Sequence, residues 1–152
     1  MTGFEPMAVQ QDWNRATDRD WAEVLAELPL FSRIGKRRLR KLARQAQFAE
    51  FAAGETVVSA GGPGDSFYVV LSGEAKARGK PAARSLRSGD YFGELALLDG
   101  GRRSATVVAT DELHVMRLPR ESFRQLTEAD PSVPLAMLTE LGRRVRQLET
   151  VG

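Results

Sequence analysis

The residue types best suited to binding chemistry lie in one segment, between Tyr91 and Arg103. Gly93 precedes a short run of helix-forming residues. A helix that begins there presents free backbone N–H groups and the positive end of its dipole, which together favour an anion. Arg103 follows a Gly100-Gly101 turn that can fold the chain back, and its planar guanidinium suits the oxygens of a phosphate. The segment therefore predicts a phosphate-binding site.

Glu94 adds an acceptor close to that site. A second anion beside a phosphate is unfavourable unless it accepts hydrogen bonds from something else, and a ribose hydroxyl is such a donor. The residues alone leave two interpretations open. One is a site for a phosphorylated ligand that carries a sugar, and the other is a capped helix followed by an exposed arginine.

The elements that must position this segment are mainly strands. Ten of the fourteen glycines fall between Gly54 and Gly101, where they separate short segments rich in valine, alanine and aromatic residues. Turn signals recur about every 8–12 residues, which is typical of a barrel or jelly roll. A further strand pattern covers Ser104 to Leu118. The sequence thus predicts a mainly β fold, an eight-stranded antiparallel β-barrel of the jelly-roll type that includes a short phosphate-binding helix.

Helical spacing of apolar residues predicts helices on both sides of the barrel. The N-terminal helices run from Asp18 to a stop at Pro29 and from about Lys36 to Ala46, and the C-terminal helices cover Arg120–Thr127 and Pro134–Glu149. Residues 1–17 show no clear periodicity. We therefore expect a flexible leader over residues 1–17 and one domain over residues 18–152.

Composition excludes several kinds of chemistry. The chain has no cysteine, so disulfides, thiolate metal sites and cysteine nucleophiles are excluded. Its single histidine, His114, cannot form a two-histidine metal site and lies in an alternating stretch typical of a strand. The glycine-rich segment 61–65 lacks the lysine of a phosphate-binding loop. We expect no metal, no cofactor and no catalysis.

Charge and hydropathy bear on location and partners. The chain shows no signal peptide and no run of 18 apolar residues, so a cytoplasmic protein without a membrane span is expected. A net charge of +2 gives no strong nucleic-acid signal. The second predicted helix nevertheless has one basic face. That face is either solvated or a docking surface for nucleic acid or a membrane; it carries Lys36, Arg37, Arg40, Lys41 and Arg44.

The stretch from Phe92 to Val107 resembles the phosphate-binding cassette of the cyclic nucleotide-binding domain family. The resemblance extends from about Trp21 to Glu149, because the preceding turns, such as Gly64-Asp65 and Gly89-Asp90, are also similar. It implies a regulatory sensor that binds a cyclic nucleotide, with cAMP expected rather than cGMP. The alternatives are a cGMP-selective sensor, or a basic-helix docking module with a vestigial nucleotide pocket.

The resemblance also assigns the site residues. Glu94 would bind the ribose 2′-hydroxyl and Arg103 the cyclic phosphate, with further phosphate contacts through backbone or close approach at residues 93, 95 and 96. Ser104 would add a hydroxyl, which can reach either a phosphate or a guanine amino group. The expected ligand-binding set is Phe92, Gly93, Glu94, Leu95, Ala96, Arg103, Ser104 and Ala105.

The last predicted helix is expected to transmit ligand occupancy to an effector protein or domain that the sequence does not identify. Since no aromatic residue follows Phe123, the base could instead be covered by Arg143, Arg144 or Arg146. One apolar seam lies on this helix and should pack on the barrel or on a second copy of the chain, as a homodimer. The seam comprises Leu138, Leu141, Val145 and Leu148.

Overall fold

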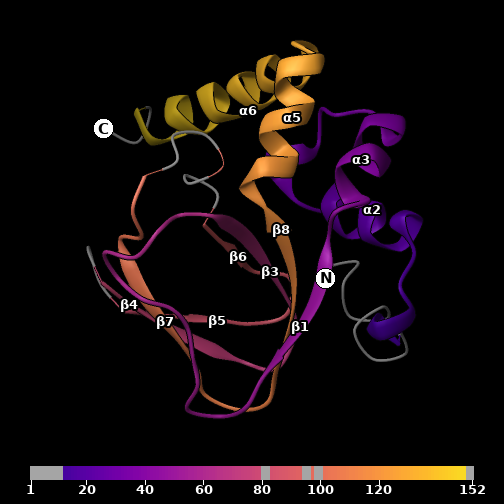
Figure 1. The fold of residues 1–152 in the computed structure, drawn as a ribbon. Coiled ribbons are helices and arrows are strands. Elements are labelled where there is room, and N and C mark those ends of the chain that lie inside the picture. Colours follow the sequence, from indigo (N-terminus) through magenta and orange to yellow (C-terminus); the bar gives the residue numbers. More distant parts are fainter. Residues whose placement is uncertain (1–11, 80–82, 94–96, 98–100, 150–152) are drawn as a thin grey trace.

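The computed structural model describes residues 12–79, 83–93, 97 and 101–149. Its strands form two four-stranded antiparallel sheets that face each other (Figure 1). The first sheet has the order β1 (Gln47–Phe51), β8 (Leu113–Pro119), β3 (Ser66–Ser72), β6 (Tyr91–Phe92). The second has the order β2 (Thr56–Val58), β7 (Ala105–Ala109), β4 (Ala75–Gly79), β5 (Arg84–Leu86).

The expected mainly β fold with flanking helices is confirmed. In the described part of the chain, strands pair only within their own sheet, so the closed barrel stays a prediction. His114 lies in β8, as its alternating surroundings predict. A short phosphate-binding helix was predicted within Tyr91 to Leu98, beginning at Gly93, but Tyr91–Phe92 form strand β6. Of the rest of this stretch, Gly93 is not helical, and Leu97, the only residue after it that is described, is helical and buried.

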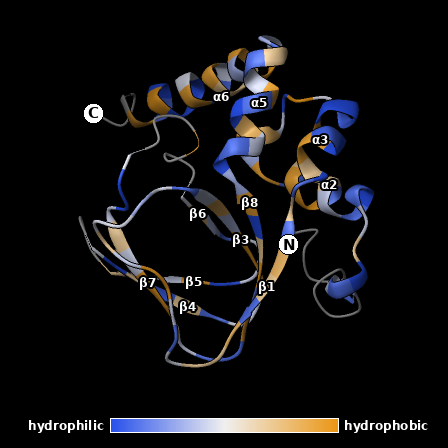
Figure 2. Ribbon diagram, viewed as in Figure 1, coloured by the Kyte–Doolittle hydropathy of each residue, from blue (hydrophilic) through white to orange (hydrophobic). Residues whose placement is uncertain are grey.

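The core has two parts because β3 is covered on both faces. Val70 and its neighbours fill the space between the two sheets, whereas Val69 faces the helices. Residues 66–71 are consequently all buried, although strand side chains alternate between faces. Strand β8 is likewise covered on both faces, with Val115 in the core between the sheets and Met116 in the helical core, while His114 and Arg117 are half-buried. Hydrophobic residues, coloured orange, recur along the strands and on the helices (Figure 2).

The helices cover one side of the first sheet (Figure 1). They are α2 (Asp18–Ala26), η2 (Pro29–Phe31), α3 (Lys36–Ala43), α5 (Arg120–Ala129) and α6 (Ser132–Glu149). Helix α2 begins with a capping box, in which Thr17 and Asp20 satisfy each other's backbone N–H groups. Helix α3 ends three residues earlier than predicted, because the chain must turn before β1 begins at Gln47.

The predicted leader includes a docked part. Residues Trp13–Arg15 form the short helix η1, and Trp13 is 5% exposed. Its indole stacks on that of Trp21, with 5.0 Å between ring centroids. Residues 12–17 therefore pack with the domain. Residues 1–11 lie outside the described residues, so a flexible leader over them stays a prediction. None of the described helices is both long and apolar enough to cross a membrane.

Candidate ligand site

The position of Arg103 is fixed by hydrogen bonds between its backbone and the turn at Gly61 and Gly62. Its N–H donates to Gly62 O at 2.9 Å, and its carbonyl accepts from the Gly61 N–H at 2.9 Å. The neighbouring Arg102 side chain donates to Gly61 O at 2.8 Å. Gly61 has φ +81, a conformation that glycine adopts without strain. The glycine turn before β3 thus fixes the direction in which the Arg103 side chain leaves the chain.

The Arg103 guanidinium is buried, with the residue only 8% exposed. Its Nη2 donates to Ser66 O at 2.6 Å, and the Asp65 carboxylate lies 3.8 Å away. Its Cζ lies 5.6 Å from the centroid of the Tyr68 ring, within range of a cation–π contact. Burial lowers the pKa of Arg103, and the nearby Tyr68 and Asp65 offset part of that shift. The site therefore keeps a positive charge away from solvent.

Two nitrogens of this buried cation, Nε and Nη1, have no hydrogen-bond partner in the described part of the chain. A buried donor without a partner costs about 1–3 kcal/mol, and more when the group is charged. Native structures rarely leave such a group unsatisfied without a reason. Arg103 is consequently suited to donate to the oxygens of an anionic ligand.

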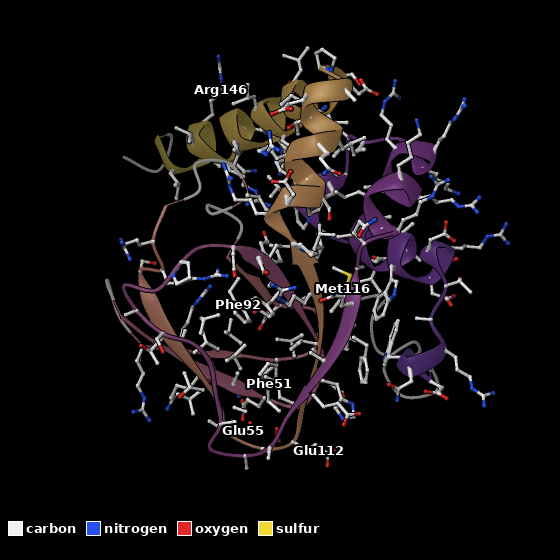
Figure 3. All side chains as sticks on the ribbon, in the orientation of Figure 1. Phe51, Glu55, Phe92, Glu112, Met116 and Arg146 are labelled. Carbon is white, nitrogen blue, oxygen red and sulfur yellow. The ribbon has the colours of Figure 1, made fainter. Side chains whose placement is uncertain are left out.

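Gly93 is required at the end of β6 for two reasons. Its φ of +84 is strained for any residue with a side chain. A Cβ atom at this position would also overlap Arg103 Nη1 and lie 2.8 Å from Ser66 O. The absence of a side chain lets the Gly93 backbone come directly beside the guanidinium. Phe92, the residue before it, is buried between the two sheets and stacks on Tyr68 at 4.9 Å (Figure 3).

The structure brings together three of the expected site residues, namely Phe92, Gly93 and Arg103. Ser104 is exposed and Ala105 is half-buried at the start of β7, directly after Arg103. Glu94, Leu95 and Ala96 lie outside the described residues, so their positions stay predictions. The ligand roles of all eight residues are likewise still predictions.

Three further residues lie around Arg103 that the sequence did not single out for the site. They are Asp65, Ser66 and Tyr68, and they reach Arg103 because the turn just before β3 is hydrogen-bonded to the Arg103 backbone. A single sequence carries no signal for this pairing, because strands β3 to β6 separate the turn from Arg103 along the chain. Only the glycine-rich turn at residues 61–64 hinted that the chain folds closely here.

The arginines of α6 occupy different positions. Arg144 donates to the Tyr91 hydroxyl at 2.9 Å, which connects α6 to the strand that leads into Gly93. Arg143 donates to the Glu140 carboxylate at 2.7 Å. Arg146 is exposed and points away from the sheets (Figure 3). Of the three candidate lid residues, Arg144 is therefore the one directed at the β6 end of the site.

Glu140 is the anchor of α6. It is 2% exposed and lies 3.6 Å from Arg33 Nε and 3.6 Å from Arg144 Nε, in addition to its bond with Arg143. The hydrogen bond from Arg143 lowers the pKa of the Glu140 carboxyl, and the positive charges of the three arginines lower it further. Helix α6 is thus docked through a buried carboxylate on the segment that follows η2.

The predicted apolar seam of α6 does not pack on the sheets. Leu138, Val145 and Leu148 are 61%, 52% and 76% exposed, and only Leu141 is packed against the core. The side that does pack carries Val133 and Met137, which are fully buried, together with Glu140. Packing of the seam on the barrel is therefore wrong for the described structure.

The fold and this site are those of a small domain of two β-sheets that holds a buried cation suited to an anionic ligand. The family model described as cyclic nucleotide-binding domain matches residues 48–130. The chain belongs to the cyclic nucleotide-binding domain family.

Two curated relatives illustrate the range of this family. The chain is 41% identical over 111 residues to a cAMP-dependent protein kinase regulatory subunit of Aspergillus fumigatus, covering 71% of this chain and 27% of that protein. It is 30% identical over 131 residues to a CRP-like cAMP-activated global transcriptional regulator of Mycobacterium tuberculosis, covering 82% and 58%. The chain therefore spans only part of the length of either relative.

Two solved structures have the same fold. The N-terminal domain of a transcriptional regulator from Streptomyces coelicolor A3(2) superposes with a TM-score of 0.72 at 30% identity, covering 82% of this chain and 94% of that one. The regulatory domain of Toxoplasma gondii PKA, solved with cAMP, gives 0.67 at 27% identity, covering 86% and 50%.

Proposed function

We propose that this domain is a non-catalytic sensor that binds cAMP at Arg103 and passes ligand occupancy to an effector through α6. The observation that carries the proposal is the buried guanidinium of Arg103 with two unpartnered nitrogens beside Gly93. A cyclic phosphate supplies the charge and the acceptor oxygens that this cation lacks. The names of the relatives, which refer to cAMP, support the choice of nucleotide.

The sugar contact is assigned to Glu94, next to Gly93 in the sequence. A carboxylate accepts hydrogen bonds and would accept one from the ribose 2′-hydroxyl. We expect Glu94→Gln to weaken cAMP binding less than the loss of Arg103, because one hydroxyl contact changes rather than a charge pairing. The control ligand is 2′-deoxy-cAMP. Equal losses for this ligand in the wild type and the variant would argue against a bond between Glu94 and the ribose.

Titration calorimetry with cAMP, cGMP and 5′-AMP tests the proposed ligand. We expect saturable binding of cAMP, weaker binding of cGMP and the weakest binding of 5′-AMP, which has a sugar and base but no cyclic phosphate. Tighter binding of cGMP would replace cAMP by the second candidate, for which Ser104 could contact the guanine amino group. No binding of either cyclic nucleotide would overturn the proposal and favour a vestigial pocket.

The path from the site to α6 is assigned to Tyr91. This residue lies two positions before Gly93, and its hydroxyl accepts from Arg144, which is itself close to Glu140. A ligand shifts the equilibrium between a docked and a detached α6 only if it binds the two states with different affinities. We propose that cAMP tightens the docking of α6 as a lid over the site. Hydrogen exchange should then show more protection from Leu135 to Leu148, and unchanged protection there would reject α6 as the output.

The exposed apolar residues of α6 are assigned to a homodimer. Leu138 and Val145 are seven residues apart, the spacing of one coiled-coil position, and Leu148 follows on the same side. About two heptads are too short to associate alone, so the contact would also include other parts of the domain. Analytical ultracentrifugation should detect a dimer that is lost in a Leu138→Ser, Val145→Ser double variant. A monomer at all concentrations would overturn this assignment.

A further inference from the structure

A groove with a volume of about 710 Å³ lies between α2 and α3, on the helical side of the molecule and outside the nucleotide site. Six cationic side chains line it, and nitrogen-tipped side chains extend from these two helices in Figure 3. The six are Arg19, Lys36, Arg37, Arg40, Lys41 and Arg44. One carboxylate, Glu23, and two alanines complete the lining. The groove is thus strongly positive.

The positive charge of the groove is poorly neutralised within the chain. Arg40 and Arg44 each lie 3.9 Å from the same carboxylate, that of Asp18. The other four cations make no ion pair with the described residues. By contrast, Arg38, on another side of α3, donates to the carboxylate of Asp130. Within α3, the unneutralised charge is therefore on the face that borders the groove.

The spacing of these cations selects a shape of ligand. Lys36, Arg40 and Arg44 lie four residues apart on α3, which puts them about 6 Å apart along the helix axis. In an extended peptide, alternate side chains point to one side and repeat every 6.6–6.8 Å, roughly the same interval. An extended segment with acidic residues at alternate positions would therefore meet successive cations along α3.

The lining disfavours other polyanions. Single-stranded nucleic acid is bound by aromatic side chains on which bases stack, and the described lining of the groove contains none. Peripheral binding to a membrane uses large apolar residues on a protruding surface. This surface is instead concave and has only Ala22 and Ala26 as apolar lining. Small residues leave room for a peptide backbone between the two helices.

We propose that the groove between α2 and α3 binds an extended acidic segment of a partner protein, with Asp or Glu at alternate positions. Arginine and lysine along α3 would pair with the carboxylates, and the alanines of α2 would contact the intervening residues. The binding would be sensitive to salt, because all of these cations are partly exposed to solvent. It does not depend on nucleotide binding at Arg103.

Fluorescence anisotropy with a labelled peptide of about eight residues, alternating Asp and Ala, tests the proposal. The groove variant is Arg37→Glu with Lys41→Glu. The matched control is Lys76→Glu with Arg84→Glu, an identical change of charge at exposed positions on β4 and β5. We expect the groove variant to bind roughly tenfold more weakly and the control to change less than about twofold. Circular dichroism and cAMP titration check that each variant folds.

Three outcomes would overturn the proposal. Equal losses in the groove variant and the control would mean that only net charge attracts the peptide. Equal binding of a peptide with the same composition but contiguous acids would contradict the spacing argument. Tighter, groove-dependent binding of duplex DNA or of phosphatidylserine vesicles would assign the surface to a different class of partner.

Discussion

Two regions of this domain bury a charged side chain, and they treat it in opposite ways. At the sheet end, Arg103 is 8% exposed and has two nitrogens without a partner among the described residues. Beneath α6, Glu140 is 2% exposed and has three arginines around it. Both charges cost desolvation energy when they are buried. The second is surrounded by charges of opposite sign, whereas the first is only partly compensated within the described part of the chain.

This difference separates a binding site from a structural anchor. A carboxylate with several cationic partners is satisfied without a ligand, so Glu140 is suited to hold α6 on the domain. A guanidinium with unused donors is satisfied only when something else supplies acceptors. The comparison predicts that variants at Arg103 change ligand affinity, whereas variants at Glu140 change the docking of α6.

The largest effect is expected for Arg103→Ala. The phosphate would lose a charge-assisted partner in a partly desolvated pocket, which should weaken cAMP binding by roughly 2–5 kcal/mol in titration calorimetry. The fold should survive, because the substitution also removes unsatisfied buried donors. Arg117→Ala is the matched control, since Arg117 lies 4.0 Å from the same Asp65 but is more exposed. A loss below threefold with the fold intact would contradict the phosphate role.

Gly93→Ala should have the next largest effect. The positive φ costs about 1–2 kcal/mol for a residue with a side chain, and the new Cβ would push Arg103 from its position. We expect weaker cAMP binding together with a lower free energy of unfolding in urea. Gly54→Ala is the control, because Gly54 also has a positive φ but its Cβ would meet nothing within 4 Å. If both variants bound cAMP equally well, Gly93 would serve only the turn.

Glu140→Gln tests the other side of the comparison. Loss of the charge leaves three arginines close together without their anion, so α6 should detach more often. Hydrogen exchange of α6 amides should accelerate by an amount on the order of tenfold, while cAMP affinity changes less than in Arg103→Ala. Glu121→Gln, which affects an exposed pair with Arg124 on α5, is the control. Equal acceleration in both variants would contradict the anchoring role.

The smallest effect is expected for Asp130, a partly exposed carboxylate. Hydrogen bonds from Ser132 and Arg38 lower the pKa of Asp130 to about 2. Because this pKa lies below the ordinary value of about 3.9, the stabilisation is complete above that pH and is lost as the pH falls towards 2. The urea midpoints of the wild type and Asp130→Asn should differ at pH 6 to 7 and converge near pH 2. A difference that is constant with pH would contradict this assignment.

The sequence predicted the helices and strands well where local signals agree. Helix α2 ends at Ala26, shortly before the predicted stop at Pro29, and the glycine turns separate the strands. Of the two packings predicted for the apolar seam of α6, packing on the barrel is wrong, because Leu138 and Val145 are exposed while Glu140 is buried on the docked side. A buried glutamate is favourable here only because three arginines surround it, and Arg33 is distant from it in sequence. Periodicity cannot detect such long-range compensation.

In the candidate site, too, the residues with a local signal were predicted and their partners from distant segments were not. Gly93 and Arg103 stood out because their residue types suit an anion and a turn could bring them together. The turn at residues 61–62 that pairs with the Arg103 backbone, and the Ser66 carbonyl that accepts from its side chain, depend on pairing between distant segments. These partners are backbone atoms, which any residue provides. Their role therefore leaves no trace in residue identity.

The stacked indoles of Trp13 and Trp21 give the protein a built-in optical probe. They are its only two tryptophans, and they lie together at the N-terminal side of the helices. Both of its tyrosines, Tyr68 and Tyr91, belong to the opposite region, around Arg103 and Arg144. Excitation at the red edge of the absorption band would therefore report only the docking of η1. Tyrosine absorbs only at shorter wavelengths, so changes around Tyr68 and Tyr91 would not contribute to this signal, and the leader could be followed separately from the ligand site.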